Sequence, residues 1–80
     1  MIGATLRRMR TDPARWAGET LSLATVASRL GDAGWPCTRS AVSRWERGER
    51  RIDSALLATW LEILEATPGE RAALLAPARP

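Results

Sequence analysis

Arginine and serine share one side of a helix predicted over about residues 39–47. Five residues fall within about 140° of arc on its helical wheel, namely Arg39, Ser40, Ser43, Arg44 and Arg47. Ala41, Val42 and Trp45 fall on the opposite side. An arginine can donate two hydrogen bonds to a guanine, and a serine can bond several bases or a phosphate. The pattern therefore fits a helix that reads base edges, or else the solvated charged face of an ordinary amphipathic helix.

The segment before this helix favours the first of these two interpretations. Ser22 is a suitable N-cap for a helix over about residues 23–30, and Gly31 is expected to end that helix in the left-handed conformation. A turn then leads to Thr38, the predicted N-cap of the arginine-bearing helix. A helix, a glycine-containing turn and a second helix that is basic on its outer side form a helix-turn-helix. This motif places its second helix in the major groove of DNA.

Three further helices are predicted, over about residues 2–10, 55–66 and 68–76. The first must stop near Asp12-Pro13, because a residue before proline avoids the helical region. Asp53 or Ser54 caps the second. Thr67, with a glutamate three positions later, is a capping-box start for the third.

Size and patterning limit the fold to one class. No segment alternates apolar and polar residues for long, so no strand is expected. Eighty residues are enough for one small domain only. We therefore predict an all-α, compact five-helix domain over residues 1–76, followed by a disordered tail over residues 77–80.

The composition argues against catalysis. The chain has no histidine and a single cysteine, Cys37, so the usual general base, a disulfide and a cysteine-ligated metal site are all missing. No apolar run approaches the roughly 18–20 residues that span a membrane, and the N-terminus lacks a signal-peptide core. We expect a non-enzymatic protein without cofactor or metal, in the cytoplasm and associated with the nucleoid.

Charge is distributed unevenly along the chain. Residues 1–51 hold ten of the twelve arginines and five acids, which gives a net charge of +5. Residues 52–80 hold two arginines and four acids, which gives −2. A basic first part and an acidic second part suggest one face for a polyanion and another for a different contact.

Several segments resemble the helix-turn-helix of the phage repressor and Cro family, also called the xenobiotic-response-element (XRE) family. The resembling strings are LRRMR (6–10), LSLATVASRLG (21–31), TRSAVSRWERGERR (38–51) and DSALLATWLEIL (53–64). The connections around Trp16 and Trp35 are longer than is usual in that family. Each tryptophan either anchors its own loop on the core or offers a contact to DNA or a partner.

The resemblance implies a role for individual positions. Arg39, Ser40 and Arg44 correspond to positions that usually meet base edges. Thr38, Ser43 and Arg47 correspond to positions that reach phosphates or flank the bases. Glu46 corresponds to a glutamate that pairs, in some members, with an arginine on the first helix, here Arg10, while Val42 and Trp45 correspond to core positions. We expect further contacts to the DNA backbone from Arg7, Arg8, Arg10, Arg50 and Arg51.

The helix predicted over residues 55–66 has more apolar surface than one core contact needs. Its apolar residues spread over about 160° of the wheel, against about 100° for a single contact. Either the flanking helices cover the surplus, or it forms a twofold interface. The expected interface residues are Leu56, Ile63, Leu74 and Leu75.

These observations predict a repressor of prokaryotic or phage type that binds double-stranded DNA as a homodimer on a short inverted repeat. The alternative is a protein-interaction module, such as an antitoxin or a coactivator. Its main surface would be the helices predicted over residues 55–66 and 68–76, and its partner a protein.

Overall fold

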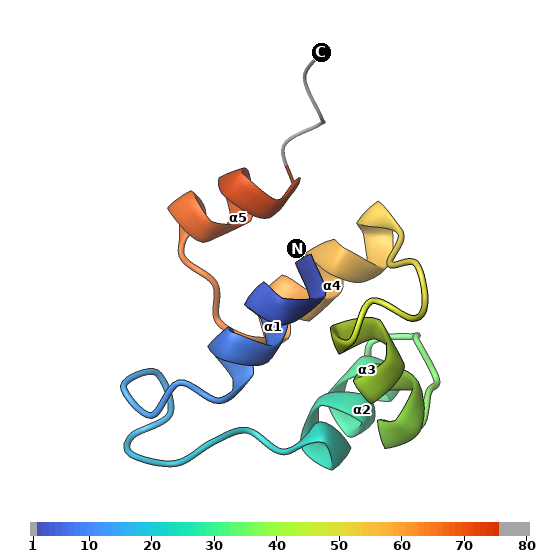
Figure 1. Cartoon of the computed structure of the whole chain (residues 1–80), viewed down its shortest axis with the longest axis horizontal. Coiled ribbons are helices and arrows are strands. Elements are labelled where there is room, and N and C mark those ends of the chain that lie inside the picture. Colours follow the sequence, from blue (N-terminus) through green and yellow to red (C-terminus); the bar gives the residue numbers. More distant parts are fainter. Residues whose placement is uncertain (1, 76–80) are drawn as a thin grey trace.

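The computed structural model describes residues 2–75, which form five α-helices and no strand (Figure 1). The helices are α1 (Ile2–Arg10), α2 (Leu23–Asp32), α3 (Arg39–Glu46), α4 (Ser54–Ile63) and α5 (Pro68–Leu75). The all-α prediction is therefore confirmed. The predicted tail over residues 77–80 lies outside the described residues.

A thin core lies between α1, α2, α3 and α4. Its fully buried side chains are Leu6, Val26, Leu30, Val42, Trp60, Leu61 and Leu64. Helix α2 packs against α3 and α4, α1 packs against α3, and α5 packs against α4. Figure 1 shows α2 and α3 together on one side of α1, with α5 on the opposite side. The core thus fixes α3 by its apolar side and leaves its other side exposed.

Side-chain caps begin four of the helices as the sequence predicts. Ser22 accepts a hydrogen bond from the backbone N–H of Thr25, and Thr38 accepts one from Ala41. Asp53, rather than Ser54, caps α4. At α5, the reciprocal pair of Thr67 and Glu70 forms the expected capping box. Such caps satisfy N–H groups that have no partner within the helix.

Two predicted helix ends were wrong. Helix α2 continues through Gly31 to Asp32, and the left-handed residue is Gly34, with φ of 97°. The backbone N–H of Trp35 then closes the turn onto the carbonyl of Leu30 at 2.8 Å. Helix α4 ends at Ile63 instead of residue 66, because the chain turns left-handed two residues later, at a φ of 57°.

The two long connections are held on the body of the domain. Trp16 donates from Nε1 to the carbonyl of Met9 at 2.8 Å, and both Trp16 and Trp35 pack against the core. This placement favours loop anchoring over the alternative contact with DNA or a partner. None of the helices among residues 2–75 has the length and apolar character needed to cross a membrane.

Candidate nucleic-acid interface

Helix α3 presents its predicted base-reading side chains to solvent. Arg39, Ser40 and Arg44 are exposed, and Ser43 is half-buried beside them. Val42, on the opposite side of the helix, is fully buried. The structure therefore brings the three residues Arg39, Ser40 and Arg44 together on one outward surface, which we call the α3 face.

The start of α2 lies beside the α3 face. Ser22, Leu23 and Ala24 line one shallow hollow together with Arg39 and Ser40. Helices α2 and α3 are in direct contact, so the longer turn between them does not separate the two halves of the helix-turn-helix. The N-cap Thr38 is exposed at the same end of α3.

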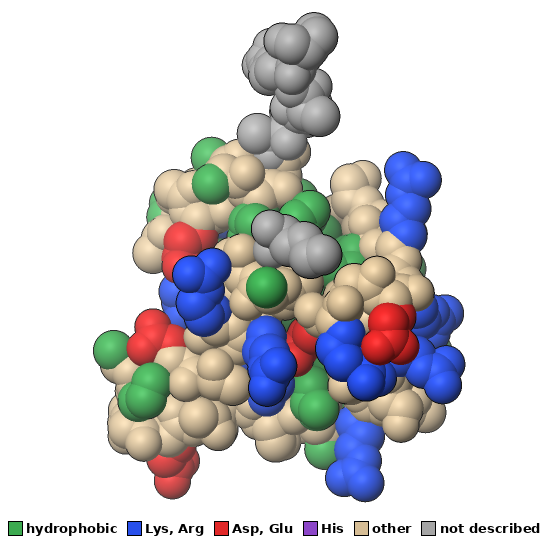
Figure 2. All heavy atoms as spheres, in the orientation of Figure 1, with side chains coloured by type: hydrophobic (Ala, Val, Ile, Leu, Met, Phe, Trp, Pro, Cys, Tyr) green, Lys and Arg blue, Asp and Glu red, His purple; other side chains and the backbone are tan. Residues whose placement is uncertain are grey.

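Most of the arginines around α3 carry uncompensated charge. Among residues 2–75, the arginines that form no ion pair are Arg7, Arg8, Arg29, Arg39, Arg44, Arg50 and Arg51. Figure 2 shows basic side chains gathered on the side that carries α3 and the segment leading to α4. This distribution gives the α3 face a positive potential that attracts a polyanion.

Arg10 and Glu46 form a buried ion pair between α1 and α3. Arg10 donates from Nε to Oε2 of Glu46 at 2.7 Å, and from Nη2 to Oε1 at 3.0 Å. Its Nη1 donates to the carbonyl of Leu21 at 3.0 Å. The two side chains are only 11 % and 3 % exposed. Arg10 is therefore a structural residue, and we do not retain it among the proposed DNA-backbone contacts, because each guanidinium nitrogen already donates a hydrogen bond within the domain.

The other predicted backbone contacts are placed differently from one another. Arg7 lines a hollow with Ser43 and Arg47, next to the α3 face. Arg47 is exposed and lies 3.2 Å from a carboxylate oxygen of Glu49. Arg51 lines a separate hollow that also contains residues of α1 and α5.

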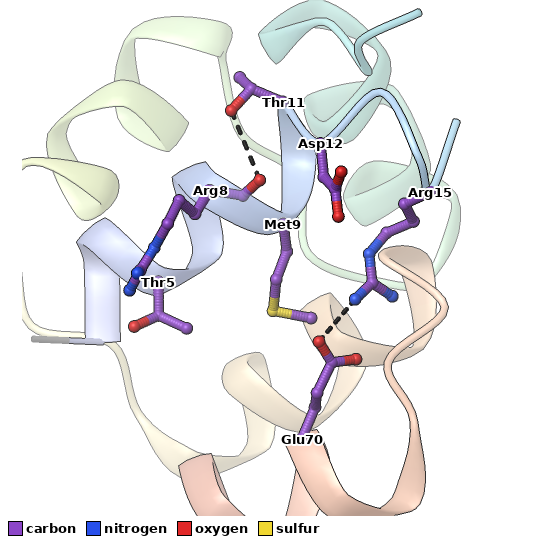
Figure 3. A pocket seen from close by; sticks show the side chains of 7 residues that line it. All are labelled: Thr5, Arg8, Met9, Thr11, Asp12, Arg15 and Glu70. Carbon is purple, nitrogen blue, oxygen red and sulfur yellow. Dashed lines mark hydrogen bonds and ion pairs between the residues drawn. The ribbon is translucent and has the colours of Figure 1, made fainter. Parts of the chain in front are cut away.

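Arg8 lines a hollow formed by α1, the loop that follows it and α5, with no residue of α3 in its lining (Figure 3). Its lining mixes both charges and consists of Thr5, Arg8, Met9, Thr11, Asp12, Arg15 and Glu70. Arg15 crosses this hollow to Glu70, with Nη2 and Oε2 at 2.6 Å. The structure does not bring Arg8 to the α3 face, so we remove it from the predicted phosphate contacts.

Trp45 is half-buried, so its expected place in the core was only partly correct. The fully buried tryptophan is Trp60, whose ring meets Trp45 edge to face with centroids 5.9 Å apart. The guanidinium carbon of Arg50 also lies over the Trp45 ring, 5.0 Å from its centroid.

Gly3, which was not among the predicted site residues, is buried and sets how closely α1 approaches α3. A Cβ atom at this position would lie 2.6 Å from the carbonyl oxygen of Trp45 and closer still to that of Glu46. The available signal was an isolated glycine inside a helical pattern, which commonly marks close packing.

Leu56 cannot belong to a dimer interface, because it is 3 % exposed and packs inside the protomer. The surplus apolar surface expected on α4 is mostly covered within the chain. Ile63 and Leu74 are half-buried against the core. Leu75 is exposed, and it lines a hollow with Ile2.

Metal-ligating side chains and the single cysteine, Cys37, are the remaining groups of chemical interest. No cluster of three metal-ligating side chains exists within the part of the chain that the structure describes. Burial raises the pKa of the Cys37 thiol, whose sulfur lies 4.0 Å from the carbonyl oxygen of Ala27. A raised pKa makes the thiol a weak nucleophile at neutral pH.

Comparison with known families identifies the class of protein. A family model described as "Helix-turn-helix domain" matches residues 2–74. The chain belongs to this helix-turn-helix family, in agreement with its resemblance to phage repressors of the XRE type. No curated protein and no solved structure matches the chain. Fold, α3 face and family together indicate a DNA-binding regulatory domain.

Proposed function

We propose that the protein is a sequence-specific transcriptional repressor that binds a short inverted repeat in double-stranded DNA as a homodimer. The observation that carries this proposal is the α3 face. Arg39, Ser40 and Arg44 are exposed there, while Val42 holds the same helix in the core. A helix fixed from behind and bearing arginines in front can enter a major groove without rearrangement.

Base contacts and phosphate contacts have different roles in the proposed complex with DNA. Arg39 and Arg44 each have a free guanidinium that can fork onto guanine, and Ser40 lies between them. The proposed phosphate contacts are Arg7, Thr38, Ser43, Arg47 and Arg50, whereas Arg51 lies in a separate hollow. Phosphate contacts set position and affinity, and base contacts set sequence preference. Occupation of a promoter by such a domain would prevent transcription.

The proposed twofold contact lies at the hollow between the start of α1 and the end of α5. Ile2 and Leu75, the large hydrophobic residues exposed among residues 2–75, both line it. Arg51 and Asp53 lie in the same lining, so the surface carries both charges and is suited to contact a copy of itself. The protein-interaction alternative loses the α4 part of its proposed surface, which is largely buried, whereas the α5 part has no buried residue.

Selection of operators from random DNA, followed by titration with variants, tests the proposal. Arg44→Ala should weaken binding to the selected site by about 1–3 kcal/mol and change binding to scrambled DNA little. Arg71→Ala removes an arginine from α5 and should change neither. Equal losses on both DNAs would make Arg44 a phosphate contact. Wild-type binding that ignores sequence would contradict the proposed repressor function.

A further inference from the structure

A stack of three side chains links the core to the surface at the end of α3. Trp60 is fully buried, and Trp45 meets it edge to face at an interplanar angle of 71°. Arg50 lies over the Trp45 ring, with its guanidinium carbon 5.0 Å from the centroid. This distance is within the range of an attractive cation–π contact.

The backbone between Trp45 and Arg50 is folded so that this stack can form. Gly48 adopts a left-handed φ of 77°, and its N–H donates to the carbonyl of Trp45 at 3.1 Å. The N–H of Glu49 donates to the carbonyl of Arg44 at 2.9 Å. The chain therefore turns back over the last turn of α3 and brings residue 50 above the indole.

The stack leaves the charge of Arg50 available. Its side chain is exposed and takes part in none of the ion pairs among residues 2–75. The nearby Arg47 differs, because Glu49 offsets its charge at 3.2 Å. An arginine that rests its flat face on an aromatic ring keeps its N–H edge free to bond a phosphate.

We propose that Trp45 is a positioning residue for DNA binding, which holds the Arg50 guanidinium ready to bond a backbone phosphate at the C-terminal end of α3. The inference rests on the proposed function. A free arginine loses side-chain entropy when it binds, and an arginine ordered beforehand loses less. The fixed indole thus raises affinity for DNA of any sequence, although it need not touch the DNA.

The stack itself can be tested without DNA, by NMR of the free protein. Protons on the Arg50 side chain should resonate upfield in the wild type, because they lie over the face of an indole. They should return toward ordinary values in Trp45→Leu and move less in Trp45→Phe, which keeps an aromatic face. Ordinary shifts in the folded wild type would show that the stack is absent in solution and would overturn the inference.

The positioning role is tested by a double-mutant cycle of Trp45→Leu and Arg50→Ala on DNA affinity. Each single variant should weaken binding to selected and scrambled DNA alike, by about threefold to tenfold. Arg50→Ala should also reduce the slope of log K against log salt by about 0.9. The double variant should bind no more weakly than Arg50→Ala alone, because without Arg50 the indole has nothing to position.

Arg7→Ala serves as the matched control in the same cycle. Arg7 is an exposed arginine near the α3 face, outside the stack, so its loss should multiply with that of Trp45→Leu. If the losses from Trp45→Leu and Arg50→Ala also multiply, Trp45 acts only through the fold and the inference is wrong. Trp45→Phe, in a cycle with Arg50→Ala, answers the same question if Trp45→Leu does not fold. A wild type without DNA affinity would reject the proposed function together with the inference, whereas multiplied losses would reject the inference alone.

Discussion

The ion pair of Arg10 and Glu46 makes the stability of the fold sensitive to the loss of either partner. They join the last turns of α1 and α3 by two hydrogen bonds, and the Leu21 carbonyl adds a third segment to the same group. An exposed ion pair contributes little to stability. This pair is almost fully buried, so removal of one partner leaves a charge without its counterion in a site of low polarity.

We therefore expect Glu46→Gln to lower the free energy of unfolding by about 3–5 kcal/mol, measured by urea denaturation. The double replacement Arg10→Met with Glu46→Leu should recover most of this loss, because it removes both charges together. A single variant as stable as the wild type would show that the pair is more hydrated than its 3 % and 11 % exposure indicates.

The sequence predicted the partners of this pair but not its burial. The identities came from the resemblance to phage repressors, some of which pair a glutamate at the position of Glu46 with an arginine on the first helix. Burial depends on how far α1 sinks onto α3, and that distance follows from Gly3 and the adjacent carbonyl groups. The same limit applies to Trp45 and Trp60. A helical wheel gives the side of the helix on which each tryptophan lies, whereas the exposure of its ring depends on which other helix packs over it.

At the scale of elements, capping residues located helix starts better than glycines located helix ends. Ser22, Thr38 and Thr67 cap as predicted, because an N-cap acts through hydrogen bonds within three residues. Gly31 and Gly34 are equally permissive by residue type. The left-handed one is Gly34, just before Trp35, whose N–H bonds the Leu30 carbonyl and whose ring packs against the core. Arg15 illustrates a wholly non-local contact, since it donates to the carbonyl groups of Leu64 and Glu65 at the end of α4.

The three glycines of α1, α2 and the following turn should respond in different ways to alanine. Gly31→Ala should raise the free energy of unfolding by about 0.5–1 kcal/mol, since it lies in a helix with nothing within 4 Å of the added Cβ. Gly34→Ala should cost about 1–2 kcal/mol, because its φ is 97°. Gly3→Ala should cost about 1–3 kcal/mol through its clash with two backbone carbonyls. Thermal or urea denaturation measures the stability of the three variants. If Gly31→Ala were less stable than the wild type, Gly31 would be the left-handed helix cap that the sequence predicted.

The start of α5 makes stability sensitive to acid. The pKa of the Glu70 carboxyl is held below its ordinary value, first by the hydrogen bond from the Thr67 backbone N–H and then by Arg15. A lowered pKa in the folded state stabilises the fold above the ordinary pKa of glutamate, about 4.3, and this contribution is lost as the pH falls. Glu70→Gln should therefore show a smaller loss of stability on acidification than the wild type, measured by urea denaturation across the acid range. Glu62→Gln corrects for the change in net charge, and equal pH profiles for Glu70→Gln and wild type would contradict the assignment.

At the scale of the whole molecule, the proposed DNA-binding side and the remaining exposed apolar surface are built from different elements. The α3 face lies beside the start of α2, whereas the hollow lined by Ile2 and Leu75 lies between the start of α1 and the end of α5. A domain of this size contacts few phosphates, so its affinity for an operator gains greatly when two copies bind together. Because the hollow and the α3 face are separate surfaces, each copy can contact a second copy while its α3 face remains exposed.

We therefore expect the wild type to sediment as a dimer at micromolar concentration and Ile2→Glu to sediment as a monomer. Ile2 is 40 % exposed and lies in the first turn of α1. A negative charge there interacts favourably with the helix dipole, so the variant should keep its helicity. Its affinity for an inverted repeat should fall steeply, while its affinity for a single half-site should stay close to that of the wild type. Ala72→Glu places the same charge on an exposed position of α5 that does not line the hollow, and it should remain dimeric. A wild type that sediments as a monomer, yet binds the inverted repeat with full affinity, would exclude this surface as the dimer contact.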